Sequence, residues 1–155
     1  MKISIPDKLI YRIFFSVLLL SLISCSKPKP DDQQIMDTLA IMTKAIKDKK
    51  VNDLMLYFDA GFRGQQRLYK SDMRTLALYQ FRAFKNLGVV VSNVDIKLKG
   101  KEASVTAYVL LAGTDATLPQ GGRLLAVESS WRKEKENWLI YQAKWQDVVG
   151  EQRLP

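Results

Sequence analysis

The chain has 155 residues, with 24 lysines and arginines against 16 aspartates and glutamates, and a formal net charge of +8. It contains one cysteine and no histidine, which excludes serine–histidine and cysteine–histidine catalysis and histidine metal sites. We predict neither a metal site nor a cofactor. Residues 131–138 mix aromatic residues with cations, a combination seen in nucleic-acid-binding proteins. Acids alternate with the bases there, so the local charge largely cancels, and we predict no nucleic-acid binding.

Residues 1–24 are typical of an export signal. Lys2, Lys8 and Arg12 give a positive leader, and residues 13–23 follow without a charge. A membrane-spanning helix needs about 20 apolar residues, so this run is too short to span and has the length of a signal segment. The alternative is an uncleaved anchor helix whose cysteine is incidental.

The last residues of this segment, 22–25 (LISC), resemble the lipobox of bacterial lipoproteins. The resemblance implies cleavage before Cys25, lipid on the Cys25 thiol, and attachment to a membrane through that lipid. Ser26 stands where an aspartate often retains lipoproteins in the inner membrane, which favours the outer membrane and a domain facing the periplasm. A single cysteine also fits, because an unpaired thiol is unusual in an oxidising compartment. Residues 25–34, which include two prolines, are predicted to form the lipidated cysteine and an extended tether.

The first half of the mature chain predicts helices. From about Asp31 to Lys50, apolar residues are spaced four, three and four apart, as on one face of a helix. Asn52 can cap a short second helix that reaches Phe58, and Gly61 and Gly64 predict a turn. A third helix is expected from Ser71 to Leu87, with Gly88 where a helix usually stops.

The second half changes to the two-residue period of strands. Four strands are expected, joined by turns and by one long loop at 113–122. Their expected ranges are 89–99, 102–112, 123–135 and 137–148. The sequence therefore predicts one domain of the α+β class over residues 35–148, with a tail at 149–155.

This order of elements resembles the nuclear-transport-factor-2-like superfamily. The most similar stretches are residues 45–48 (AIKD), 58–62 (FDAGF) and 137–140 (NWLI). The resemblance implies N-terminal helices packed on a strongly curved four-stranded antiparallel sheet, forming a cone. The superfamily includes isomerases, dehydratases, transport adaptors and envelope scaffolds, so the fold alone assigns no activity.

Strand alternation predicts which side chains face the helices. The more apolar face includes Val90, Val94 and Ile96 of the first strand and Val105 and Val109 of the second. This face carries no carboxylate, whereas Asp95 and Glu128 fall on the opposite face. We therefore predict a ligand-binding interior and no catalytic residue there; simple core packing is the alternative for the aromatic residues. The candidate ligand-binding residues are Tyr57, Trp131, Tyr141 and Trp145.

Asp59, at the corner after the second helix, is the one candidate for an internal acid. Its alternative roles are a helix-end cap or a partner for Arg63. The opposite sheet face is predicted to be apolar enough to bind a second copy or an envelope protein, because large apolar faces are seldom left to solvent. The candidate interface residues are Tyr108, Leu110, Leu124, Trp138 and Ile140.

Three functions remain open at this point. The first is a non-enzymatic binding module, anchored at the outer membrane, for an apolar ligand or an envelope protein partner. The second is a small isomerase-like or dehydratase-like enzyme for an apolar substrate, using Asp59 with Tyr57 or Tyr141. The third is an assembly factor whose cone is filled by side chains.

Overall fold

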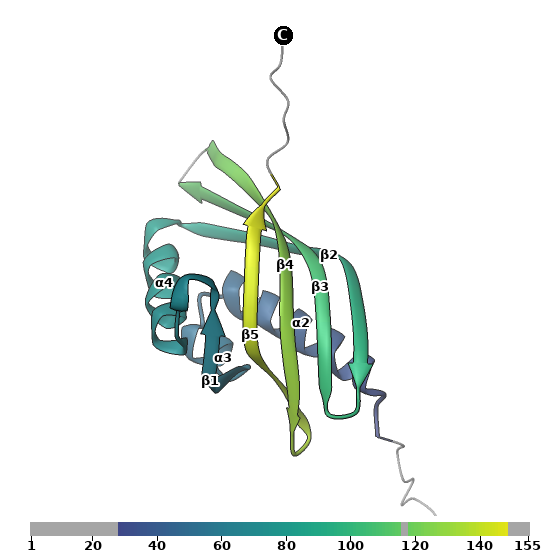
Figure 1. The fold of residues 1–155 in the computed structure, drawn as a ribbon. Helices are drawn as coiled ribbons and strands as arrows, with labels where there is room; N and C mark the ends of the chain where they lie inside the picture. The colour runs from purple at the N-terminus through teal and green to yellow at the C-terminus, as the bar shows by residue number, and fades with distance from the viewer. Residues whose placement is uncertain (1–27, 116–117, 149–155) are drawn as a thin grey trace, which may run out of the picture.

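The computed structural model describes residues 28–115 and 118–148 (Figure 1). The predicted signal segment, Cys25 and the tail at 149–155 lie outside the described residues. Within the described ranges, no helix is both long enough and apolar enough to cross a membrane.

The helices occupy the first half of the described chain. They are α2 (Asp31–Lys47), α3 (Val51–Met55) and α4 (Lys70–Ala83), with a short 3₁₀ helix, η1 (Gln65–Arg67), before α4. The prediction for α2 is confirmed, with acidic residues in its first turn and lysines in its last, as the helix dipole favours. The other two predicted helices are each shorter than expected at the C-terminal end.

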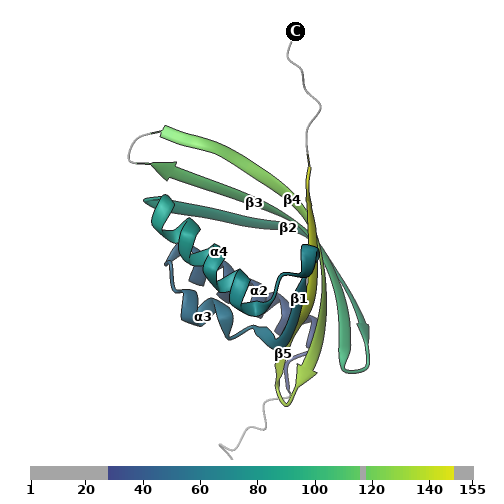
Figure 2. The ribbon, with the colours of Figure 1, turned by 60° about the vertical axis from the view of Figure 1, so that its left-hand side comes forward.

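Five strands form one sheet. They are β1 (Phe58–Gly64), β2 (Asn86–Lys99), β3 (Glu102–Asp115), β4 (Leu118–Glu134) and β5 (Asn137–Asp147), in the spatial order β1-β5-β4-β3-β2. β1 is parallel to β5, and the other pairs are antiparallel. The sheet is therefore mixed and five-stranded, not four-stranded and antiparallel as predicted. It curves around the helices, which gather on one side of it (Figure 2).

The differences between the predicted and observed elements have local causes. β1 contains two glycines and was predicted as a turn, yet Phe58 and Phe62 are both buried and pack edge to face. α4 ends before Phe84, which is extended and lies against Gly113 of β3. A side chain at Gly113 would overlap the Phe84 ring. The predicted long loop is mostly strand, since β3 and β4 continue to Asp115 and Leu118.

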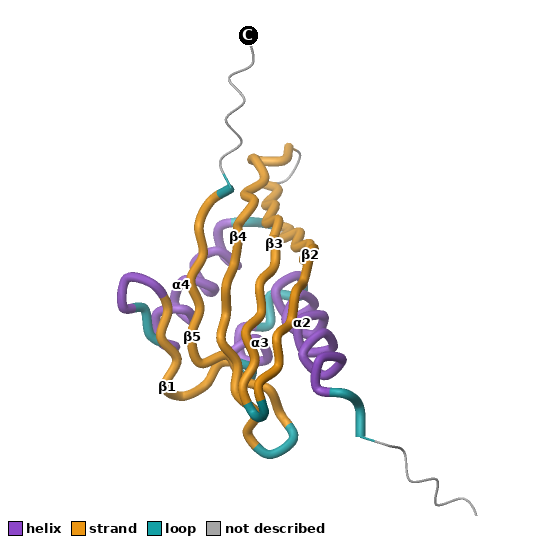
Figure 3. The backbone as a smooth tube through the Cα atoms, turned by 45° about the vertical axis from the view of Figure 1, so that its right-hand side comes forward, coloured by secondary structure: helices purple, strands orange, loops and turns teal. Residues whose placement is uncertain are grey.

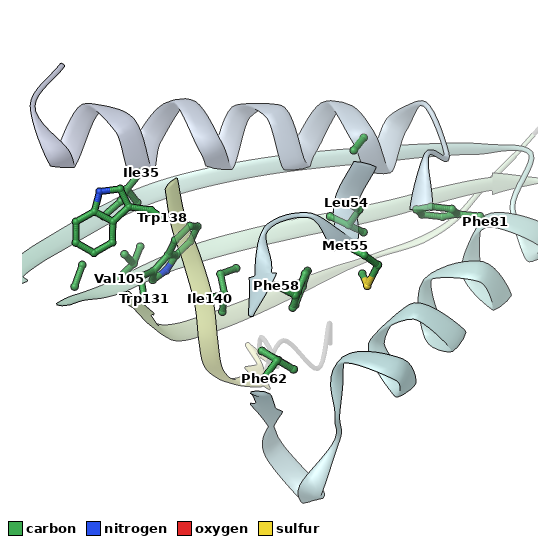
Figure 4. Close-up of a cluster of buried hydrophobic side chains, with 12 residues drawn as sticks. Ile35, Leu54, Met55, Phe58, Phe62, Phe81, Val105, Trp131, Trp138 and Ile140 are labelled. Atoms are coloured by element: carbon green, nitrogen blue, oxygen red, sulfur yellow. The ribbon is translucent and has the colours of Figure 1, made fainter. Parts of the chain in front are cut away.

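The main core lies between α2, α3 and the concave face of the sheet (Figure 4). α2 runs along the sheet beside β2 (Figure 3). At the end where α2 begins, Trp131, Trp138 and Val105 pack together under Ile35. The largest fully buried side chains are Trp131, Trp138, Phe62, Ile35 and Val105.

A bulge in β2 reverses the predicted facing of part of that strand. The pairing with β3 shifts between Ser92 and Asp95, and Asn93 has a φ of 49°. An extra residue flips the side chains beyond it to the other face. Val94 and Ile96 therefore pack on the core as predicted, whereas Val90, predicted to face the helices, is 57% exposed.

A second bulge, in β5, reverses the predicted facing of two interface residues and one ligand-binding residue. Ser130 pairs with Gln142 and Trp131 pairs with Ile140, so Tyr141 is the extra residue in β5. Trp138 and Ile140 consequently face the helices and are buried in the core, which removes them from the predicted interface. Tyr141 lies on the opposite side, where its ring contacts Arg132.

Candidate functional site

The concave face of the sheet has an apolar surface that lies outside the main core. Val109 pairs with Val91 and with Leu125, and Val127 pairs with Ala107 and Trp145. We call this the mouth surface. Its members are half-buried and do not belong to the core cluster: Val91, Ala107, Val109, Leu111, Val127 and Trp145. The helices therefore leave this part of the concave face partly open.

Two buried residues beside the mouth surface support its separation from the core. Val89 and Leu125 are buried, yet neither belongs to the core cluster that surrounds Trp131. The apolar interior thus has two parts, a filled end below α2 and a second apolar region toward the other end of the sheet. The second region is where an apolar ligand would find exposed hydrophobic surface.

An ion pair marks the rim of the mouth surface. Arg123 pairs in register with Leu111, and its Nε and Nη2 donate to the two carboxylate oxygens of Asp147 at 2.6 and 2.7 Å. The hydrogen bonds from Arg123 lower the pKa of the Asp147 carboxyl group. The two charges cancel at the rim, so the adjoining surface keeps its apolar character.

Asp59 is held by Arg132 and not by Arg63. The Asp59 side chain is almost fully buried, and Arg132 Nε donates to its Oδ2 at 2.8 Å while Nη2 lies 2.6 Å from Oδ1. The backbone N–H of Gly61 donates to the same Oδ1 at 2.6 Å. Arg63 stacks over the Tyr69 ring instead, with its Cζ 4.5 Å from the ring centroid.

These contacts bear on whether Asp59 could act as a base. Hydrogen bonding to Arg132 is the main cause that lowers the pKa of the Asp59 carboxyl group, and burial opposes it. A general base works best when its pKa lies near the working pH, whereas this carboxylate is paired and pushed further from neutrality. Arg132 lies on the sheet face opposite Trp131, so the pair also lies away from the mouth surface.

The end of the domain nearest the tether is closed by polar contacts. Asp31 in the first turn of α2 accepts from Lys133 Nζ at 2.6 Å and from Trp138 Nε1 at 3.3 Å. Trp131 Nε1 donates to Ser129 Oγ at 2.8 Å. These bonds satisfy both buried indole groups and fix α2 on the β4–β5 hairpin.

The structure does not bring the four predicted ligand-binding residues together. Trp145 lies on the mouth surface, but Trp131 has no exposed surface and belongs to the filled core. Tyr57 is half-buried at the corner between α3 and β1, and Tyr141 lies on the other face of the sheet. Nothing in the side-chain pattern marks the β5 bulge that separates Tyr141 from Trp131.

The outer sheet face keeps an apolar row that crosses β2, β3 and β4 and ends directly after β5. Val90 pairs with Leu110, Leu110 pairs with Leu124, and Val148 donates its N–H to the Leu124 carbonyl at 2.8 Å. We call Val90, Leu110, Leu124 and Val148 the outer row. All four are exposed, and so is Tyr108, which pairs with Ala126 one step along the same face. Tyr108, Leu110 and Leu124, three of the predicted interface residues, are thus exposed, and their role in an interface stays a prediction.

A shallow depression on the outer side has a different character. It measures about 170 Å³ and is lined by Gln65, Ala126, Glu128, Lys144, Trp145 and Gln146. Lys144 pairs with Glu128 at 2.7 Å, and Gln65 Oε1 accepts from the Trp145 N–H at 3.1 Å. Both charged groups and the Gln65 side-chain oxygen therefore already have partners. Among residues 28–115 and 118–148, no group of three potential metal ligands gathers.

The sequence matches no protein-family model and no curated protein. Solved structures are similar in fold. A protein of unknown function with a cystatin-like fold from Nostoc punctiforme is 17% identical, with a TM-score of 0.62, over 77% of this chain and 92% of that one. A candidate dehydratase of the NTF2-like family from Streptomyces avermitilis is 14% identical, with a TM-score of 0.67, over 80% and 100%.

A third similar structure is an NTF2-like protein from Cytophaga hutchinsonii, at 14% identity and a TM-score of 0.63, covering 77% of this chain and all of that one. Likeness at these identities concerns the fold alone. The expected architecture is confirmed at that level: the chain has the NTF2-like, cystatin-like cone fold.

Proposed function

We propose that this protein is a lipid-anchored module of the bacterial outer membrane that faces the periplasm and binds an apolar ligand on the mouth surface without transforming it. The observation that carries the proposal is the half-buried apolar surface on the concave face, outside the filled core. The lipobox-like residues 22–25 support the anchor.

The enzyme alternative rests on Asp59, and on the candidate dehydratase among the similar structures. Against it stand the ion pair with Arg132 and the lowered pKa of Asp59. Tyr141, its predicted partner, contacts Arg132 on the face opposite the mouth surface. An isomerase-like mechanism would therefore lack the base that the sequence suggested.

A second role is favoured by the outer row. Three exposed apolar side chains pair across β2, β3 and β4, and Val148, directly after β5, extends the row beside Leu124. Such a row is suited to a second copy of the chain or to an envelope protein. We include this docking role in the proposal, with Leu110 at its centre and Tyr108 beside it.

Two neighbouring residues separate the ligand role from the docking role. Val109 belongs to the mouth surface and Leu110 to the outer row, because successive strand residues face opposite sides. Val109→Asp is expected to weaken binding of a fluorescent long-chain fatty acid at least about tenfold, since it places a charge in an apolar site. Leu110→Asp is expected to leave that binding unchanged.

The same pair of variants tests docking in the reverse direction. Leu110→Asp should abolish self-association in sedimentation velocity, or partner recovery by cross-linking in intact cells, whereas Val109→Asp should preserve it. Fatty-acid binding that both variants lower equally would contradict the assignment of the two faces. A wild-type domain that stays monomeric and cross-links to nothing would contradict the docking role alone.

The anchor has its own test. Cys25→Ser is expected to block lipidation and the cleavage that depends on it, so the protein should keep residues 1–24. Intact-mass measurement of the wild-type protein from membranes should give a chain that begins at Cys25 and carries acyl groups. An unmodified chain of full length in the membrane would contradict the lipoprotein assignment and favour an uncleaved anchor helix.

A further inference from the structure

The excess positive charge of the domain lies at the C-terminal end of α2 and along α3 and α4, whereas the first half of α2 is acidic. Residues 44–53 and 70–85 hold eight lysines and arginines against three aspartates, whereas the sheet region 86–148 holds eight against seven acids. Lysines near helix C-termini complement the helix dipole in many proteins, so this charge alone would assign no partner. Its coincidence with exposed apolar side chains is more informative.

The two most exposed large apolar side chains among the described residues lie in or directly after these basic segments. Leu56, at the end of α3, is 68% exposed, and Tyr79 of α4 is 69% exposed. Leu56 is one helical turn after Asn52, whose Oδ1 accepts from Arg74 Nη1 at 2.8 Å. Tyr79 and Arg82, three residues apart, share one face of α4.

The end of α2 joins the same region. Lys49 Nζ donates to the carbonyl of Phe84, which places the α2 C-terminus beside Lys85. Lys47, Lys50, Arg82 and Lys85 are all exposed. We call the combined surface the helical face. It consists of Leu56 and Tyr79 with the cations Lys47, Lys50, Arg74, Arg82 and Lys85.

The position of the tether limits how far the helical face can lie from a membrane. α2 begins at Asp31, six residues after Cys25. Six extended residues span about 20 Å at most, so a domain anchored at Cys25 stays close to the lipid surface. The three helices lie together on one side of the sheet (Figures 1 and 2), and the described end of the tether, residues 28–30, leads directly into α2.

We propose that the helical face lies on the anionic surface of the membrane, with its cations beside lipid phosphates and with Leu56 and Tyr79 in the headgroup region. Basic residues around exposed apolar side chains are the combination that binds anionic lipid surfaces. The inference rests on the proposed anchor at Cys25. In this orientation the outer row points away from the membrane, where a protein partner could reach it.

The test uses the lipidated protein in vesicles. Because Cys25 is the only cysteine and its thiol is blocked by lipid, Ala83→Cys provides a single labelling site in the last turn of α4. An environment-sensitive fluorophore at this position should report lipid contact in vesicles that contain phosphatidylglycerol. It should report less contact in phosphatidylcholine alone, and high salt should reverse the difference. Ser104→Cys, on the outer sheet face, is the matched probe and should respond to neither vesicle.

Charge reversal provides the second comparison. In phosphatidylglycerol vesicles, Arg82→Glu with Lys85→Glu is expected to lower the ratio of lipid-contacting to free fluorophore at Ala83→Cys about tenfold or more. The control pair Lys99→Glu with Lys101→Glu, at the β2–β3 turn, changes the net charge equally and should have little effect. Equal signals at Ala83→Cys in both vesicles would overturn the proposal. A response to a soluble anionic glycan but to neither vesicle would also overturn it, by assigning the helical face to another partner.

Failure of the anchor would be distinguishable. If intact mass shows no acyl chain, the lipoprotein assignment falls. Ala83→Cys is then combined with Cys25→Ser, so that the label still has a single site, and this chain is added to vesicles from solution. Lipid contact that is selective for phosphatidylglycerol would still support the helical face, and its absence would overturn it.

Discussion

Trp131→Ala is expected to lower the free energy of unfolding by about 3–5 kcal/mol, the range for deleting a large buried aromatic side chain. Trp131 is a fully buried side chain at the centre of the filled end of the cone, against Val105 and below Ile35. Its removal leaves a cavity and also deprives the Ser129 hydroxyl group of an indole N–H. Urea denaturation followed by far-ultraviolet circular dichroism measures the difference.

Trp145→Ala is the matched control for this prediction. It also deletes a tryptophan side chain from the concave face of the sheet, but Trp145 is only half-buried and lies outside the core cluster. A loss well below that of Trp131→Ala is expected, together with weaker fatty-acid binding. Equal destabilisation by the two variants would mean that the mouth surface is packed as tightly as the core, and the assembly role would then replace the ligand role.

Arg132→Ala is the variant with the second large effect. It is expected to lower the free energy of unfolding by about 1–3 kcal/mol at neutral pH. Removing one partner of a buried pair leaves the other uncompensated, and here the Asp59 carboxylate would keep only the Gly61 N–H. The value is at the lower end for such pairs because Arg132 itself is partly exposed to solvent. Arg132→Lys should recover part of the loss, since lysine keeps the charge without the planar fork.

The effect of Arg132→Ala depends on pH in a defined direction. The pKa of Asp59 is lowered in the folded protein, so the pair stabilises the fold above the unfolded aspartate pKa of about 3.9. The advantage of the wild type over the variant should be full at neutral pH. It should shrink as the pH falls below about 4 and through the lowered pKa of Asp59.

An exposed pair on the same sheet face provides the comparison. Lys144→Ala breaks the contact with Glu128, in which both side chains are largely exposed, and should change stability by less than about 1 kcal/mol. If Arg132→Ala were as mild as Lys144→Ala at neutral pH, Asp59 would not depend on its arginine. The case for excluding Asp59 as a base would then weaken.

The sequence predicted the elements whose patterns are long and periodic. The four-residue and three-residue spacing of Ile35, Leu39 and Met42 predicted α2, and the alternation in β3 correctly placed Val105 and Val109 on the concave face. Both depend on burial of a single face, which the order of apolar residues records directly.

The sequence could not predict the features that depend on backbone irregularity or on distant contacts. The bulges at Asn93 and Tyr141 reverse side-chain facing without an apolar signal, which is why Trp138 and Ile140 were placed on the wrong face. The pairing of Asp59 with Arg132 joins residues 73 positions apart, whereas Arg63, the partner predicted from proximity, stacks on Tyr69. β1 is a strand that pairs with β5, far along the chain, and no local pattern in residues 58–64 records that pairing.

The most direct test of the ligand role is native mass spectrometry of residues 26–155, exported to the periplasm without lipidation and purified without detergent. The wild-type protein and Leu110→Asp should carry an additional mass that organic solvent extracts, and Val109→Asp should lose most of it. A bare polypeptide mass for all three proteins, with a crystal structure in which side chains fill the space above Val109 and Val127, would contradict the account.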